Sequence, residues 1–464
     1  MNLLRPDAGV LAAAPWGRRA QLLRVLGVTF GLAVTVGNTI GAGILRTPGE
    51  VAAQLPSVWL LMGAWVVGAL YALLGANSVA ELGTMMPCSG GQYVFARRAL
   101  GPYAGFVVGW SDWVSTCGSA AAVAIVIGEY TGVLVPVLAP HAMALAAGVV
   151  LAFAGLQWRG IHWGSGAQNL TSLVKALAFV AFIAACVAWG GGGALAGGAT
   201  PAATAGASLL LAVTVALQAV IYTYDGWTGV IYFSEEVRDP ARDIPRSLFG
   251  GVLVVAAIYL LFNLALLYVL PVGRLAGEPL AAGAAAAALF GERGDTLIRA
   301  LTVVSLLSAV NALLLIATRV PFAMSRDRLF PAWAVRVNRG GTPTVALLFS
   351  LAATLLFLTG GGFNQVIAVL AFFFVANYAV SFTAVFVLRR REPEAPRPFR
   401  AWGYPWTTAL ALLGSLAFMA GAVATDTRNS LYALALLALS YPAYLLVKRR
   451  AGDAGENTGR RNDE

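Results

Sequence analysis

Long apolar runs separated by short polar segments are the dominant pattern of the chain. Twelve runs are long enough, or nearly long enough, for a helix to cross the hydrocarbon core of a bilayer, which takes about 20 residues. They cover residues 25–55, 57–85, 103–136, 142–157, 167–189, 207–234, 247–271, 295–324, 342–359, 364–389, 406–424 and 430–447. The pattern predicts an all-α integral membrane protein with twelve transmembrane helices.

Charged residues are few, and most of the basic ones lie on one side of this pattern. Only 11% of the 464 residues are charged, against about 25% in a soluble domain. With a cytoplasmic N-terminus, 25 of the 31 Lys and Arg residues fall in cytoplasmic segments and five in outer segments. This asymmetry follows the positive-inside rule. It predicts a multi-pass protein of the cytoplasmic (inner) membrane with both termini cytoplasmic, and it explains the net charge of +10 without a nucleic-acid partner.

The first apolar run is interrupted near its middle by Gly37 to Leu45, GNTIGAGIL. Each glycine inside a helix costs roughly 0.5–1 kcal/mol relative to alanine. In a membrane, broken helix is tolerated only against protein or a wet cavity. A break presents N–H groups from one half-helix and carbonyl groups from the other, which suits a zwitterionic ligand. The alternative is a glycine face for close helix packing.

A second interruption, Tyr222 to Gly229 (YTYDGWTG), lies in the sixth run. The offset of five spans is odd, so the two halves enter the membrane from opposite sides, which indicates an inverted repeat with a binding site between the broken helices. The predicted organisation is a cytoplasmic tail (1–24), a first five-helix repeat (25–189), an outer linker (190–206), a second, inverted repeat (207–389), a cytoplasmic loop with helices 11 and 12 (390–447) and a cytoplasmic tail (448–464).

Four sequence blocks carry a family resemblance. They are TIGAGIL in the first run, AELGTMMPCSGGQYVFARRALGPYAGFVVGW (Ala80 to Trp110), YDGW followed by SEEVRDPARDIPRSL (Ser234 to Leu248), and NALLLIATRVPFAMSRDRLFP (Asn311 to Pro331). With the twelve-run layout they resemble the amino acid–polyamine–organocation (APC) superfamily, and most of all bacterial amino acid permeases near the L-amino acid transporter branch. The resemblance implies a LeuT-type fold of five plus five inverted helices, with helices 1 and 6 broken. It also implies a secondary active amino acid transporter that works by alternating access.

Two departures from the family pattern bear on substrate and partners. Arg46 follows the first break, where a small or apolar residue is more usual, and this puts the side-chain preference in doubt. The outer loop near Pro136 to His141 lacks the cysteine with which the eukaryotic branch binds an accessory glycoprotein. We therefore expect no such partner, only an amino acid substrate and membrane lipid, in a monomer or homodimer.

The predicted substrate site consists of the two interruptions, which would hold the α-amino and α-carboxyl groups. Its residues are Thr39, Ile40, Gly41, Ala42, Gly43, Tyr222, Thr223, Asp225 and Trp227. By resemblance, Tyr222 is the aromatic side chain that closes over the substrate, although an aromatic residue at this depth is also common core filler. Asp225 is costly at bilayer depth unless paired. Three roles are open for it: holding a substrate ammonium, holding a proton, or capping the second half-helix.

Lys175 lies about eight residues into the fifth run, deep for a lysine that snorkels to the membrane rim. In related transporters a lysine here stands where sodium-coupled relatives bind an ion. The resemblance therefore makes Lys175 an ion surrogate, with Ser305 and Ser308 beside it, and predicts sodium-independent transport. The polar stripe Thr302, Ser305, Ser308 and Asn311 either faces the cavity or satisfies backbone carbonyls. Thr171, four residues before Lys175, is expected on the same helix face.

Other charged residues lie near the predicted membrane edge. Glu81 is expected to pair with cytoplasmic arginines, and Asp112 is a second candidate proton carrier. A solvated inner loop is expected to contribute to a salt-bridged gate through Glu235, Glu236, Arg238, Arg242 and Arg246.

Several classes of function are excluded by missing motifs. The three cysteines and two histidines have no metal-ligand spacing, and no nucleophile elbow or phosphate-binding loop occurs. We therefore expect no enzyme, no cofactor, no metal and no ATP-driven pump. A polyamine or organocation transporter of the same fold and a non-transporting amino acid sensor remain as alternatives, and proton symport and antiport (exchange) both remain open.

Overall fold

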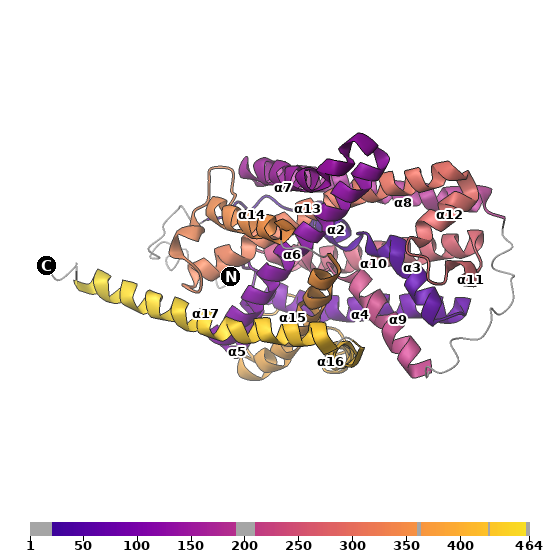
Figure 1. Ribbon diagram of the computed structural model, residues 1–464. Helices are drawn as coiled ribbons and strands as arrows, with labels where there is room; N and C mark the ends of the chain where they lie inside the picture. Colours follow the sequence, from indigo (N-terminus) through magenta and orange to yellow (C-terminus); the bar gives the residue numbers. More distant parts are fainter. Residues whose placement is uncertain (1–20, 192–208, 360–362, 426, 461–464) are drawn as a thin grey trace.

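A computed structural model describes residues 21–191, 209–359, 363–425 and 427–460 (Figure 1). This part of the chain is nearly all helical, so the predicted all-α class is confirmed. Its α-helices are α2 (Val28–Thr39), α3 (Gly43–Gln54), α4 (Val58–Met85), α5 (Gln92–Leu100), α6 (Pro102–Leu134), α7 (Ala142–Trp158), α8 (Ile161–Trp189), α9 (Leu209–Tyr224), α10 (Pro240–Val269), α11 (Val272–Leu275), α12 (Ala281–Phe290), α13 (Glu292–Arg326), α14 (Thr344–Thr359), α15 (Phe363–Arg391), α16 (Trp406–Thr425) and α17 (Thr427–Arg460). Short 3-10 helices are η2 (Pro136–His141), η3 (Gly229–Phe233) and η4 (Ala332–Val335).

Within these residues, ten helices are long and apolar enough to cross a membrane, and the number is up to eleven if the bent pair α2 and α3 is one span. The predicted ninth span corresponds to α14, an apolar helix of only 16 residues. The predicted fifth span begins earlier than expected, because α8 starts at Ile161 rather than at residue 167. The chain is a multi-pass membrane protein.

Helix starts follow local sequence signals. Pro102 and Pro240 are the first residues of α6 and α10. Proline suits this position because its missing N–H would have no intrahelical partner there and its φ is already helical. Both helices then continue for 30 residues or more.

The connections gather at two ends of the bundle. One end holds α5 and the segments 234–239, 327–343 and 392–405, and we call it the arginine-rich end. The other, the opposite end, holds η2, α11 and α12; α11 and α12 lie far from α5 in Figure 1. The sequence pattern did not predict α5, α11 or α12, because each is shorter than a span.

The core joins helices that are far apart in the sequence. α10 packs against α2 and α4, and α13 packs against α6 and α8. Large apolar side chains on the outside of the bundle, among them Leu70, Leu177 and Leu210, are more than half exposed. Such a surface suits a bilayer, where apolar side chains face lipid.

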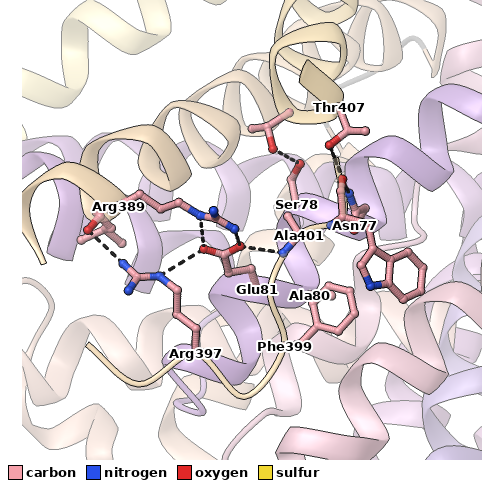
Figure 2. Close-up of polar contacts among 12 residues, drawn as sticks. Asn77, Ser78, Ala80, Glu81, Arg389, Arg397, Phe399, Ala401 and Thr407 are labelled. Carbon is pink, nitrogen blue, oxygen red and sulfur yellow. Dashed lines mark hydrogen bonds and ion pairs between the residues drawn. The ribbon is translucent and has the colours of Figure 1, made fainter. Parts of the chain in front are cut away.

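Glu81, at the arginine-rich end of α4, fastens the segment 392–405 to that helix (Figure 2). Its carboxylate accepts hydrogen bonds from Arg389 at 2.5 and 2.8 Å and from the Ala401 N–H at 2.7 Å, and it pairs with Arg397 at 3.2 Å. One turn earlier, Asn77 bonds the N–H and the carbonyl of Trp402. The predicted pairing of Glu81 with arginines is confirmed.

Parts of the predicted tails and linker lie outside the described residues. They are residues 1–20, residues 192–206 of the linker and the last four residues of the chain. At the C-terminus, α17 continues to Arg460, past the predicted end of the last span at residue 447.

Candidate functional site

The first interruption lies between α2 and α3, whose axes differ by 49°. Residues 40–42 are not helical, and Ile40 leaves the helical region with φ −78° and ψ 92°. The first N–H groups of a helix have no intrahelical partner. At the start of α3, the backbone N–H groups around Gly43 therefore lack partners within the helix. They lie next to a cavity that is lined by Gly41, Ala42 and Gly43.

The second interruption lies between α9 and η3, at residues 225–228. Gly226 has a φ of +106°, which side chains rarely adopt. A Cβ at this position would also lie 2.9 Å from the carbonyl carbon of Asn38. Glycine is therefore required here both by conformation and by the close approach of the two interruptions.

Four side chains tie the two interruptions together. The Asn38 amide donates to the Gly226 carbonyl at 3.2 Å, and the hydroxyls of Thr47 and Thr223 lie 2.8 Å apart. The buried Tyr259 hydroxyl of α10 lies 2.8 Å from the Thr39 carbonyl oxygen and 3.0 Å from that of Thr223. A change at one interruption is thereby coupled to the other.

A cavity of about 370 Å³ lies between the interruptions and α6, α13 and α15. Seven of the nine predicted substrate residues line it: Thr39, Gly41, Ala42, Gly43, Tyr222, Thr223 and Asp225. The other two do not. Ile40 is fully buried, and Trp227 stacks on Tyr378 with ring centroids 5.1 Å apart.

Two carboxylates of the cavity are held by tyrosines. The Tyr378 hydroxyl of α15 donates to a carboxylate oxygen of Asp225, and the Tyr232 hydroxyl of η3 donates to Asp112 Oδ1 at 3.0 Å. Asp225 is part of the second interruption, and Asp112 lines the same cavity from α6. The enclosed part of the cavity is therefore acidic.

Lys175 is fully buried at the middle of the 29-residue α8. The predicted depth of about eight residues was wrong because α8 begins earlier. Its ammonium donates to the carbonyls of Gly37 at 2.8 Å and Ile40 at 2.5 Å, and Ser305 of α13 also donates to Ile40, at 3.1 Å. The Lys175 amine thus donates to the carbonyl end of α2, where the helix dipole is negative.

The polar stripe of α13 packs against helices and does not face the cavity. Ser308 bonds Gln168 and Ser172 of α8 at 3.1 and 3.0 Å, and Asn311 donates to Gln168 at 2.8 Å. Thr302 bonds a carbonyl of its own helix. The cavity is lined instead by the next face of α13, at Leu306, Ala309, Leu313 and Ile316.

Ion pairs close the arginine-rich end of the bundle, where Gln92 of α5 lines the cavity. Glu236 and Arg319 form two hydrogen bonds of 3.0 Å and are at most 1% exposed, while Glu235 pairs with Arg326 at 2.5 Å. The expectation of a solvated loop was wrong for Glu236; burial raises the pKa of its carboxyl, and the Arg319 guanidinium opposes that shift. Arg238, Arg242 and Arg246 are exposed.

A second layer of the same closure involves α5. Arg97 pairs with Asp327 at 3.0 Å, and the Tyr93 hydroxyl donates to the same carboxylate at 2.7 Å. Burial, and then the neighbouring Asp327, raise the pKa of Tyr93, so the phenol stays protonated as a donor. Toward the opposite end, in contrast, the lining reaches the exposed Glu50.

Among the described residues, no group of three or more His, Cys, Asp or Glu side chains could hold a metal ion. The three cysteines are free, and only Cys88 is exposed.

The comparison with known proteins decides the family. A family model described as "Amino acid permease" matches residues 22–440, which is most of the chain. The chain belongs to the amino acid permease family. This confirms the resemblance inferred from the four sequence blocks, and it makes the permease a transporter rather than an enzyme.

Several transporters are similar to the permease along most of their length. The serine/threonine exchanger SteT of Bacillus subtilis is 28% identical over 439 residues, covering 92% of the permease and 98% of SteT. The human b(0,+)-type amino acid transporter 1 is 26% identical, covering 82% of the permease and 80% of that protein. An uncharacterised transporter of Mycobacterium tuberculosis is 32% identical, covering 77% and 80%.

Sequence reasoning missed five residues that organise the site: Gln168, Ser172, Tyr232, Tyr259 and Tyr378. Gln168 and Ser172 precede Lys175 by seven and three residues, so helical spacing could have placed all three on one face. Ser172 and Lys175 on that face donate hydrogen bonds to α2. Thr171 was predicted to share the face, but its hydroxyl donates to the carbonyl of Ala167 on its own helix. The tyrosines carried no local signal, because their partners are distant in the sequence.

Proposed function

We propose that this permease is a secondary active amino acid transporter that binds the α-carboxyl and α-amino groups of its substrate at the two helix interruptions. The observation that carries the proposal is that both interruptions border one cavity and are joined through Tyr259. Family membership supplies the substrate class, and the name of the exchanger SteT agrees with exchange as one mode of transport.

The two ends of the substrate find different partners in the cavity. The carboxylate suits the free N–H groups and the positive dipole end at the start of α3, beside Gly43. The α-amino group needs negative charge. The nearby carbonyls of Gly37, Thr39 and Ile40 already accept hydrogen bonds from protein side chains. Asp225 is therefore the acceptor that we assign to the α-amino group.

The fold that we propose is the LeuT type, with two inverted repeats of five helices followed by two further helices. The interruptions after α2 and α9, five spans apart, support this arrangement. Counting the bent pair α2 and α3 as one span and α14 as another gives twelve. The repeats that we propose keep the bounds predicted from the sequence, residues 25–189 and 207–389.

Lys175 takes the place of a coupling cation, in the proposed mechanism, so that transport needs no sodium. Its ammonium and the Ser305 hydroxyl meet at the Ile40 carbonyl, which a sodium ion would otherwise have to satisfy. Either exchange or proton symport is compatible with this arrangement.

In the proposed alternating-access cycle, the ion pairs at the arginine-rich end keep that end closed and must open later in the cycle. With the bilayer orientation given by the basic residues, that end is cytoplasmic in the inner membrane, both termini are cytoplasmic, and the cavity of this conformation belongs to the outward side. Release into the cell then requires the Glu236–Arg319 and Glu235–Arg326 pairs to part.

Counterflow into proteoliposomes tests the proposal. Vesicles preloaded with an unlabelled amino acid should accumulate labelled amino acid saturably, and methyl esters and decarboxylated analogues should compete poorly. Binding without saturable accumulation would indicate a sensor, and linear flux would indicate a channel. Competition by polyamines equal to that by amino acids would move the protein to polyamine transport.

A further inference from the structure

Asp112 has an unused acceptor atom in the cavity. Asp112 is 2% exposed. Its Oδ1 accepts a hydrogen bond from the Tyr232 hydroxyl, but its buried Oδ2 has no hydrogen-bond partner among the residues that the structure describes. A buried carboxylate oxygen without a partner is costly. Because Asp112 lines the cavity, its missing partner is expected to come from the cavity's contents.

The charges of the lining are unbalanced. In the described chain four charged side chains line the cavity: Asp112, Asp225, Glu50 and Arg46. Arg46 and the exposed Glu50 lie on α3, and Arg46 donates to the Pro279 carbonyl between α11 and α12, at the opposite end. The enclosed part therefore holds two carboxylates and no basic side chain.

A zwitterionic substrate balances only part of this charge. Its α-amino group can pair with Asp225, and its carboxylate brings a further negative charge. A second cationic group, carried by the substrate side chain, would balance Asp112. Thr116 and Ser119, four and seven residues after Asp112, lie on the same face of α6 and also line the cavity, so hydroxyl oxygens accompany the carboxylate.

We propose that the permease transports amino acids with a cationic side chain, and that Asp112 binds the side-chain ammonium or guanidinium group. This inference rests on the proposed function, in which the two interruptions hold the α-amino and α-carboxyl groups. Asp112 then determines specificity, from the part of the cavity wall that α6 forms.

Lysine and norleucine provide the test, because norleucine has the same carbon chain without the terminal ammonium. Uptake of each is measured in proteoliposomes for the wild type, Asp112→Asn and Glu129→Gln. The control, Glu129, is an exposed carboxylate on the same helix. A hydrogen bond to a charged group contributes about 1.5–3 kcal/mol. Accordingly, the wild type should prefer lysine, Asp112→Asn should lower the lysine-to-norleucine ratio about 10- to 100-fold, and Glu129→Gln should leave it unchanged.

A second variant covers the case in which Asp112→Asn does not fold. Thr116→Lys places an ammonium one helical turn from Asp112, where it can pair with the carboxylate, and it should lower the same ratio. Wild-type vesicles that take up norleucine and other neutral amino acids but not lysine would overturn the inference and leave the proposed function standing.

Two other outcomes separate the alternatives. If Asp112→Asn lowers lysine and norleucine uptake equally and removes the response to a pH gradient, Asp112 is a proton carrier and the inference is wrong. If cadaverine, which lacks the carboxylate, competes as well as lysine in the wild type, the proposed amino acid site is wrong. In that case the lysine-to-norleucine uptake ratio of Asp112→Asn still shows whether Asp112 binds the cationic group.

Discussion

The ammonium of Lys175 lies between two carbonyl oxygens at the end of α2, in a fully buried position. A charge at bilayer depth is tolerated when it faces the bundle interior and is paired with carbonyls. Here the pairing also fixes the geometry of the first interruption, because Gly37 and Ile40 flank the point at which the helix ends.

Replacing Lys175 by methionine should keep the length of the side chain and remove the donor. Two hydrogen bonds to a charged group are lost, each contributing about 1.5–3 kcal/mol, so we expect a folded protein with at least a tenfold loss of uptake. Uptake is measured in proteoliposomes with sodium replaced by choline. Thr171→Ala on the same helix should retain activity, since the Thr171 hydroxyl bonds its own helix. Strict sodium dependence of the wild type, or full activity of Lys175→Met, would refute this role.

Sequence reasoning singled out residues whose type is unusual for a membrane helix, and it missed residues whose role depends on a distant partner. Glycines, a carboxylate and a lysine inside apolar runs have few structural uses, so Gly41, Asp225 and Lys175 could be identified. Tyr259 and Tyr378 could not, because each acts on a residue that only the fold brings near. Trp227 was assigned to substrate binding, whereas it packs behind Tyr378.

Helices α4 and α15 are joined at the arginine-rich end by the carboxylate of Glu81 (Figure 2). Two guanidinium groups and a backbone N–H surround this carboxylate, which is 1% exposed. Without it the segment 392–405 would lose its contacts to α4 through Arg397 and the Ala401 N–H.

Glu81→Gln should therefore destabilise the protein. Removing one partner of a buried ion pair costs about 3–5 kcal/mol, so the thermal unfolding midpoint in detergent should fall clearly. The matched control is Glu392→Gln, which breaks the surface pair with Arg98 at 2.6 Å. That pair is worth at most about 1 kcal/mol. Equal midpoints for the two variants would contradict the anchoring role.

Apolar runs predicted the positions of the long helices, because a bilayer requires long apolar segments. They failed where a helix does not need to span. Helix α12, at the opposite end, is alanine-rich but has only 10 residues, and the helical extension of α8 toward Ile161 is too polar to count as part of a run. Both features depend on packing against neighbouring helices rather than on lipid.

For the molecule as a whole, the proposed orientation makes the arginine-rich end cytoplasmic. Cys88 lies at that end and is the only exposed cysteine of the described residues. A membrane-impermeant maleimide should label it in inside-out vesicles but not in right-side-out vesicles. Desolvation raises the pKa of the Cys88 thiol. Because the thiolate is the reactive form, labelling should become faster as the pH is raised.

The control for this measurement is Cys88→Ala, which should abolish labelling, since Cys117 and Cys186 are buried. Labelling of the wild type in sealed right-side-out vesicles would reverse the proposed orientation, and with it the side to which the cavity opens.

The cavity between the two interruptions is the feature on which the proposed mechanism depends. A Cβ added at Gly41 meets nothing within 4 Å, because Gly41 faces this cavity. A Cβ added at Gly148 of α7 also meets nothing within 4 Å, and that glycine is on the exposed surface. The two positions therefore form a matched pair in which only the side chain added at Gly41 enters the cavity.

The decisive measurement is saturable amino acid uptake by proteoliposomes containing Gly41→Val or Gly148→Val, at equal amounts of folded protein. We predict that Gly41→Val lowers uptake at least about 100-fold, because the added side chain occupies the space where the substrate's carboxylate approaches the backbone. Gly148→Val should transport like the wild type. Wild-type uptake by Gly41→Val would mean that the substrate does not bind at the helix interruptions.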